Sequence, residues 1–131
     1  MKNNVLKMIK YLYYFSLIVL LIIYLFPGSL IGYLLYGDFG KQPDLIPNPI
    51  GTSINHALAF FYLSILALIS YMRESSFKQT VIFLIALSIV LELFHSVVPN
   101  RSFQFLDLFA NLFGTLIAIF IIIFYKKYNN L

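Results

Sequence analysis

Four long apolar stretches, separated by polar segments, constrain this chain more than any other feature. They run from about residue 11 to 26, 54 to 71, 80 to 98 and 106 to 125. A helix that crosses the bilayer core needs roughly 20 mostly apolar residues, with a range of about 17–25. The chain is 61% apolar and 11% charged, whereas soluble domains are about half apolar and one quarter charged. The sequence therefore predicts an all-α membrane protein, with four transmembrane helices in one domain covering residues 1–131.

The only long connection is the segment 27–53, between the first two spans. Pro27 and Gly28 form a pair that ends helices. The other helix-breaking residues of this segment are Gly37, Gly40, Pro43, Pro47, Pro49 and Gly51. They argue against a continuous helix, and we expect the short apolar piece 29–36 to lie at the membrane interface.

The basic residues predict the orientation of the spans, because Lys and Arg near span ends are retained in the cytoplasm. Seven of the nine fall on one side of an alternating four-span arrangement: Lys2, Lys7, Lys10, Arg73, Lys78, Lys126 and Lys127. Lys41 and Arg101 lie in the other two loops. We therefore expect both termini in the cytoplasm (N-in, C-in). A cleaved signal peptide is the competing interpretation of the amino terminus, but no small-x-small cleavage site follows the first apolar run.

Polar residues gather at the predicted outer ends of three spans. Placing a charge in an apolar span costs about 2.5–3.5 kcal/mol on insertion scales, so such residues are candidates for a functional site. Glu92 and His95 lie on one face of the third span, because residues three apart share a helix face. The candidate outer-face polar site comprises His56, Glu92, His95, Arg101, Asp107 and Asn111. Topology alone brings these residues to the same membrane level.

The fourth span also carries a ridge of small residues, Ala110, Gly114 and Ala118. Small residues at four-residue spacing allow a neighbouring helix to approach closely. For Asn111, Gly114 and Thr115 we favour a packing role, since polar and small residues commonly hold membrane helices together.

Arg101 has both a functional and a structural interpretation. In the functional one, its guanidinium holds a phosphate or carboxylate in bidentate fashion, and Asp107 with Asn111 orients it. In the structural one, Arg101 pairs with Glu92 or Asp107 and staples the turn between the last two spans. We favour function for Glu92 and Arg101, because intramembrane ionisable residues mark functional sites by default.

Several classes of chemistry lack support in the sequence. The chain has no cysteine, which excludes disulfides and thiolate chemistry, and its scattered basic residues form no nucleic-acid-binding patch. It has no His-Glu-x-x-His spacing, Gly-rich phosphate loop or Gly-x-Ser-x-Gly elbow. We expect no cofactor and no bound metal, and we favour a protein that is not an enzyme.

A hydrolase or transferase acting on lipid-linked phosphates stays open. It would use a His–carboxylate base or a metal set of His56 and His95 with Glu92 or Asp107.

The polar residues also resemble a family pattern. The segments 92–95 (Glu-Leu-Phe-His), 98–102 (Val-Pro-Asn-Arg-Ser) and 107–114 (Asp-x-x-x-Asn-x-x-Gly) are similar to those of the VanZ-like family of small bacterial membrane proteins. In that family a Glu ends one span, a Pro-Gly-Arg-Ser-like turn follows, and Asp, Asn and Gly enter the next. His56 resembles the family's His at the start of the preceding span. The resemblance covers about residues 50 to 120.

The chain departs from this pattern at three places. Thr52-Ser53 stands where the family often has Asp-Lys, His95 where Gln is common, and Asn100 where Gly is usual. If the Asp-Lys pair takes part in the family's activity, that activity is in question for this chain.

The resemblance implies a multi-pass protein of the bacterial cytoplasmic membrane that influences susceptibility to the glycopeptide teicoplanin. It also implies an association with cell-wall precursor or envelope polysaccharide and sorting machinery. Our first hypothesis is that the outer-face site binds an anionic cell-wall or lipid-linked saccharide intermediate. The alternative is a non-catalytic scaffold or partner subunit of an envelope assembly. The ligand, the partners beyond the lipid bilayer and the oligomeric state stay open.

Overall fold

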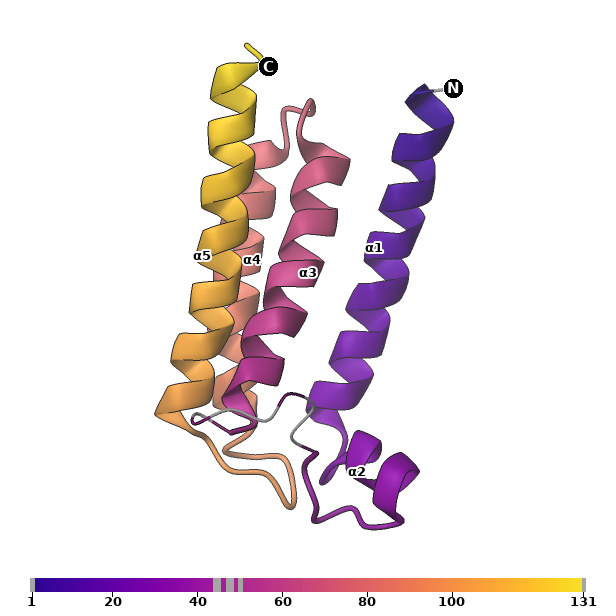
Figure 1. Cartoon of the computed structure of the whole chain (residues 1–131), viewed down its shortest axis with the longest axis vertical. Helices are drawn as coiled ribbons and strands as arrows, with labels where there is room; N and C mark the ends of the chain where they lie inside the picture. The colour runs from indigo at the N-terminus through magenta and orange to yellow at the C-terminus, as the bar shows by residue number, and fades with distance from the viewer. Residues whose placement is uncertain (1, 44–45, 47–48, 50, 131) are drawn as a thin grey trace.

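The computed structural model describes residues 2–43, 46, 49 and 51–130. This part of the chain forms five α-helices: α1 (Lys2–Leu25), α2 (Leu30–Tyr36), α3 (Ser53–Tyr71), α4 (Phe77–Phe94) and α5 (Phe105–Tyr128). The four long helices run side by side, with both termini at one end and α2 at the other (Figure 1). All four are long and apolar enough to cross a membrane. The predicted all-α class with four spans is therefore confirmed.

The helix boundaries differ from the predicted ones mainly at two ends. α1 begins at Lys2, well before the expected residue 11, so its first turns carry the amino-terminal lysines. α4 ends at Phe94 instead of continuing to residue 98. Proline disfavours helical backbone in the residue before it, and the chain ahead of Pro99 closes with tight turns. One of these is the bond from the Val97 amide to the Phe94 carbonyl, at 3.0 Å.

The turn that follows α4 uses a left-handed residue. Asn100 has φ of 58°, and Asn tolerates this conformation better than most residues that carry a side chain. This is the position where Gly is usual in the family pattern, and Gly adopts a left-handed conformation readily. His95 is the C-cap of α4. After the turn, the Arg101 side chain extends back to the end of α1.

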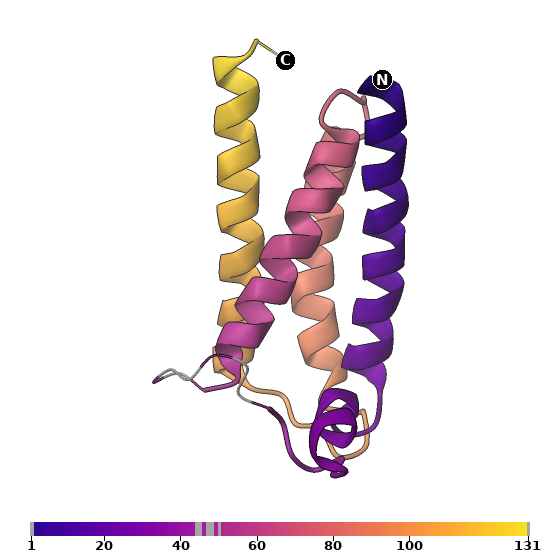
Figure 2. The same cartoon turned by 45° about the vertical axis from the view of Figure 1, so that its right-hand side comes forward.

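The segment between α1 and α3 folds over the end of the bundle opposite the termini. Ser29 caps α2 by accepting a bond from the Gly32 amide at 2.9 Å, and Gly37 ends the helix in a left-handed conformation. Gly32 packs so closely on the Lys41 carbonyl that a Cβ atom would clash with it. Figure 2 shows α2 outside the four-helix bundle, beyond the end of α1. Among the described residues of this segment α2 is the only helix, so no continuous helix runs through them, as expected. Pro47 lies outside the described residues.

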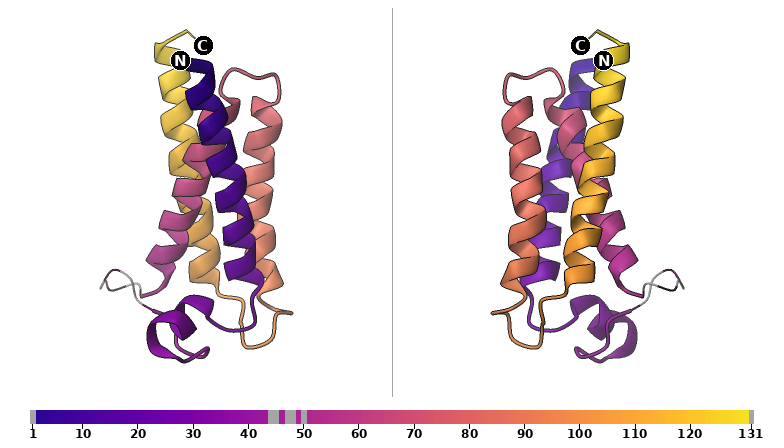
Figure 3. Two further views of the ribbon diagram at one scale, coloured as in Figure 1. Left: turned by 90° about the vertical axis from the view of Figure 1, so that its right-hand side faces the viewer. Right: turned by 90° about the vertical axis from the view of Figure 1, so that its left-hand side faces the viewer.

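α3 occupies the centre of the bundle, where it contacts α1, α4 and α5, and its most extensive interface is with α5. Figure 3 shows the four long helices from two opposite sides. The small-residue ridge of α5 explains the close α3–α5 contact: Gly114 and Ala118 are buried, whereas Ala110 is half-buried. A Cβ atom on Gly114 would clash with the Ala57 carbonyl of α3. The polar residues at this end of α3 and α5 are therefore brought together.

Candidate functional site

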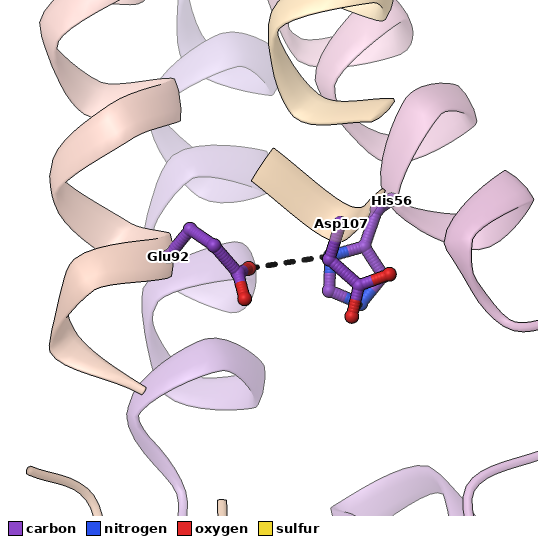
Figure 4. A group of neighbouring side chains, drawn as sticks. All are labelled: His56, Glu92 and Asp107. Atoms are coloured by element: carbon purple, nitrogen blue, oxygen red, sulfur yellow. Dashed lines mark ion pairs between the residues drawn. The ribbon is translucent and has the colours of Figure 1, made fainter. Parts of the chain in front are cut away.

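The centre of the polar cluster is a trio of buried side chains from three different helices. His56 comes from α3, Glu92 from α4 and Asp107 from α5, with exposed fractions of 4%, 0% and 2%. One ring nitrogen of His56, Nδ1, lies 3.8 Å from Glu92 Oε2, and the other, Nε2, lies 3.6 Å from Asp107 Oδ2. Figure 4 shows the Glu92 carboxylate directed towards His56 and Asp107. The juxtaposition follows from the span ends meeting at one membrane level.

Tyr24 of α1 determines which nitrogen of His56 carries a proton. Asn111 donates through Nδ2 to the Ser88 carbonyl and to Glu92, at 3.4 and 3.5 Å, so its Oδ1 atom accepts from the Tyr24 hydroxyl at 2.9 Å. A hydroxyl has one proton to donate. Tyr24 therefore accepts from His56 Nδ1–H, at 2.9 Å. His56 Nε2 is left facing the Asp107 carboxylate without a hydrogen bond, because 3.6 Å is too long for one.

Each carboxylate is held by donors on one of its oxygen atoms. The Ser53 hydroxyl donates to Asp107 Oδ1, and the Gln104 amide, just before α5, donates to Glu92 Oε1 at 3.1 Å. Ser53 is one of the two residues that stand where the family pattern often has Asp-Lys. In this chain that position therefore gives Asp107 a neutral donor in place of an ammonium group.

His95 closes the cluster from the end of α4. Its Nδ1 atom lies 3.3 Å from Glu92 Oε2, and its Nε2 atom donates to the Tyr24 carbonyl at 3.1 Å. The ring also stacks on Tyr24, with centroids 5.3 Å apart. At 2% exposure His95 is fully buried, so it positions Glu92 and Tyr24 from inside the protein.

The contacts of Arg101 in the structure are not the ones that either interpretation of the sequence predicted. Its guanidinium donates to the Ile23 carbonyl at 2.9 Å and to the Phe26 carbonyl at 3.5 Å. These are unsatisfied acceptors at the end of α1, where the last carbonyls of a helix lack intrahelical partners. In the described part of the chain, Arg101 forms no ion pair with Glu92 or Asp107. The expected orientation of Arg101 by Asp107 and Asn111 is therefore wrong, since α1 is nearer and supplies the acceptors.

Arg101 keeps its positive charge in this setting. Partial burial lowers the pKa of its guanidinium, while Tyr24, Glu92 and Asp107 oppose that change. Arginine does not lose its proton in proteins. A half-buried cation that forms no ion pair with a carboxylate of the described residues is thus present at this end of the bundle.

A cavity of about 150 Å³ opens beside the cluster, between α1, α3 and the segment around α2. Its polar lining consists of Tyr24, Ser29, Gln42, Asn55, His56 and Arg101. Asn55 donates to the Pro43 carbonyl at 2.9 Å, and its Oδ1 atom is buried with no hydrogen-bond partner among the described residues. A larger cavity of about 900 Å³ lies at the termini end, far from these residues. The larger cavity is lined by charged residues as well, Lys7, Lys10, Arg73 and Glu74. We place the candidate site at the smaller cavity because it adjoins the buried cluster through His56 and Tyr24.

Sequence reasoning did not identify two residues that the structure places at the centre. Tyr24 and Ser53 bond directly to members of the predicted set, and both are buried. The sequence did contain a signal for Tyr24, since its hydroxyl lies near the end of an apolar span, where it needs a hydrogen-bond partner. The six predicted site residues all lie at this end. Five share the buried network, and Arg101 binds the end of α1.

We expect Tyr24→Phe to destabilise the protein by about 1–3 kcal/mol, because it leaves His56 Nδ1–H and Asn111 Oδ1 buried without partners. Unfolding of purified protein in detergent, followed by circular dichroism, measures the change. Tyr62→Phe is the matched control, since the hydroxyl of this exposed tyrosine accepts a single bond within the described part of the chain, from Ser16 at 3.3 Å. Equal stability of the two variants would contradict the assigned network.

Comparison with known proteins identifies a family and no individual relative. The sequence model of the family described as VanZ/LLP1 matches residues 11–126. No curated protein and no solved structure gives a significant match. The matched segment covers α3 and α4 entirely and most of α1 and α5, and it contains every residue of the polar cluster.

Proposed function

Because this chain belongs to the VanZ/LLP1 family, we propose that it is a cell-envelope protein whose cavity binds an anionic headgroup. The headgroup belongs to a cell-wall or lipid-linked saccharide intermediate, and its binding influences teicoplanin susceptibility. The observation that carries the proposal is Arg101, which lines the cavity beside His56 and Tyr24. A guanidinium recognises phosphate and carboxylate groups through paired, charge-assisted hydrogen bonds.

The surroundings of Arg101 support an anionic ligand. The carbonyls of Ile23 and Phe26 hold two of its nitrogens, and a guanidinium has five N–H donors in all. Within the described ranges, the donors beyond these two contacts form no hydrogen bond, and we propose that they bind the ligand. Ser29 and Asn55 add polar groups to the cavity wall, which suits a ligand that combines an anion with saccharide hydroxyls.

The proposed orientation places this cavity on the outer side of the bacterial cytoplasmic membrane, with both termini inside. The described lysines and arginines support it, since most of them lie on the elements at the termini end: Lys7, Lys10, Arg73, Lys78, Lys126 and Lys127. Lys41 and Arg101 are on the opposite end, and basic residues near span ends favour the cytoplasm. An outward-facing cavity is accessible to intermediates on the side where glycopeptides act.

A second candidate function, hydrolysis or transfer at a lipid-linked phosphate, rests on His56. Its ring lines the cavity and lies against Asp107, 3.6 Å away. An imidazole beside a carboxylate is the usual arrangement of a general base. This candidate needs the same anion site, so the first experiment tests both.

We expect expression of the wild type to reduce teicoplanin susceptibility of a sensitive bacterial host, and Arg101→Ala to lose this protection. The physical reason is the loss of the only guanidinium in the cavity lining. Minimum inhibitory concentrations are measured at membrane levels matched by immunoblot, because Arg101→Ala also removes bonds to α1 worth about 1–2 kcal/mol. Arg101→Lys should restore little, since an ammonium lacks the planar fork of donors.

Lys41→Ala is the control, because this exposed lysine lies at the same end and stacks on Tyr36 outside the cavity. It should protect as well as the wild type. If Arg101→Ala protects equally at matched abundance, the headgroup proposal is wrong. Protection that depends only on the amount of folded protein would favour the alternative role of a scaffold or partner subunit in an envelope assembly.

A further inference from the structure

We propose that His56, Glu92 and Asp107 form a binding site for one divalent transition-metal ion, with Zn²⁺ as the best match. One nitrogen of His56 and one oxygen of each carboxylate all lie within 4.8 Å of one another, and all three residues are buried. Imidazole and carboxylate are favoured zinc ligands. The site goes beyond the headgroup proposal and does not depend on it.

The distance between His56 and Asp107 fits a shared ion better than it fits a direct hydrogen bond. Two ligand atoms that lie about 2.0–2.2 Å from a tetrahedral ion are roughly 3.3–3.6 Å apart. His56 Nε2 and Asp107 Oδ2 are 3.6 Å apart, beyond the range of a good hydrogen bond. Since Tyr24 engages Nδ1–H, the Nε2 lone pair points at a carboxylate oxygen, and an ion between the two atoms turns this repulsive contact into two favourable ones.

The supporting contacts have the form expected around a metal. A ligating histidine usually donates its other N–H to an acceptor, and ligating carboxylates are themselves hydrogen-bonded. Here Tyr24 receives His56 Nδ1–H at 2.9 Å. Ser53 binds one oxygen of Asp107, and the Gln104 amide binds one oxygen of Glu92 at 3.1 Å. His56 and Asp107 are thus each held through one atom and have another atom that faces the other residue. One oxygen of Glu92 lies within 4.8 Å of the other candidate ligand atoms, and its Oε2 atom also accepts from Asn111 Nδ2 at 3.5 Å.

The charge of the cluster favours a cation as well. Glu92 and Asp107 are almost fully buried, and a buried carboxylate is costly unless a positive charge compensates it. Within the described ranges, the only ion-pair partners of these two carboxylates are imidazoles. Ser53 provides a hydroxyl instead of a charge. A divalent ion neutralises both carboxylates at once, and three protein ligands leave a fourth position for water or a ligand group.

The test uses the full chain in detergent, purified with a tag that contains no histidine, stripped with chelator and then dialysed against Zn²⁺. We expect about one tightly bound Zn²⁺ per chain by elemental analysis and a rise in Tm on zinc addition, because an ion that binds the folded state stabilises it. Asp107→Asn should weaken zinc binding by about tenfold or more. Glu74→Gln, an exposed acidic residue at the termini end, is the matched control and should bind like the wild type.

Two further measurements keep the test decisive. Co²⁺ in place of Zn²⁺ should give the visible absorption of a tetrahedral nitrogen–oxygen site, and Mg²⁺ should compete poorly because it prefers octahedral oxygen ligands. These use the wild type alone, so they hold even if Asp107→Asn fails to fold. Wild-type protein with no stoichiometric zinc and an unchanged Tm would overturn the proposal, as would equal zinc in Asp107→Asn and Glu74→Gln. The imidazole of His56 would then carry the compensating charge itself. Neither result bears on teicoplanin protection by Arg101.

Discussion

Gly114→Leu is expected to abolish accumulation of folded protein in the membrane. The Gly114 backbone lies against the Ala57 carbonyl and the Phe61 amide of α3, so any side chain at this position forces α5 away from α3. Overpacking of a tight interface costs about 1–3 kcal/mol and occasionally more. We expect leucine to reach about 3 kcal/mol or more, since the clash is with backbone. Immunoblots of membrane fractions and unfolding of any purified protein measure the loss.

Gly114→Ala should produce a smaller loss of the same sign, because even a single Cβ atom clashes with the Ala57 carbonyl. Phe113→Leu is the matched control, since Phe113 is the neighbouring residue and is 62% exposed on the outer face of α5. It should accumulate like the wild type. Normal accumulation of Gly114→Leu would show that α3 and α5 do not pack as closely as described.

His56→Ala is expected to destabilise the protein by about 3–5 kcal/mol, the range for breaking a buried charge cluster by removing one partner. The change removes the imidazole between Glu92 and Asp107 and leaves two buried carboxylates without it. It also deprives the Tyr24 hydroxyl of its donor. Chemical unfolding in detergent, with the wild type measured in parallel, gives the difference in free energy of unfolding.

A charge-neutral combination separates electrostatics from packing. His56→Ala together with Glu92→Gln and Asp107→Asn should recover part of the loss, because no buried charge is then uncompensated. Lys10→Ala is the control for an exposed pair, since Lys10 and Glu74 are 3.1 Å apart and largely solvated, and should cost less than about 1 kcal/mol. If the triple variant is no more stable than His56→Ala, the loss comes from packing rather than from charge.

The sequence allowed the polar residues to be predicted as one group, but it did not allow the contacts between them to be predicted. The buried network shows why. Span lengths and loop positions place His56, Glu92 and Asp107 at one end of the bundle without any knowledge of side-chain direction. Which atoms meet depends on the rotation of each helix about its own axis. Packing sets that rotation, chiefly the contact of Gly114 with Ala57.

The partners of Arg101 show the same limit. Sequence offered two carboxylates as its partners, because charge complementarity is visible in a sequence. The acceptors in the structure are backbone carbonyls at Ile23 and Phe26, which every residue carries and no sequence pattern marks. The expected lack of a metal rested on the missing His-Glu-x-x-His spacing, whereas the candidate ligands come from three helices and share no short spacing.

The amino-acid sequence by itself determined the helical class, the number of spans and the end of the bundle that is polar. These follow from hydrophobic length and from the high cost of burying charge in lipid, both of which are sums over local residues. The tertiary structure determined that Tyr24 joins α1 to the cluster, that Ser53 binds Asp107 and that α4 ends at Phe94. Such contacts depend on how closely helices approach and how they are rotated, and these quantities exist only once all four helices have packed together.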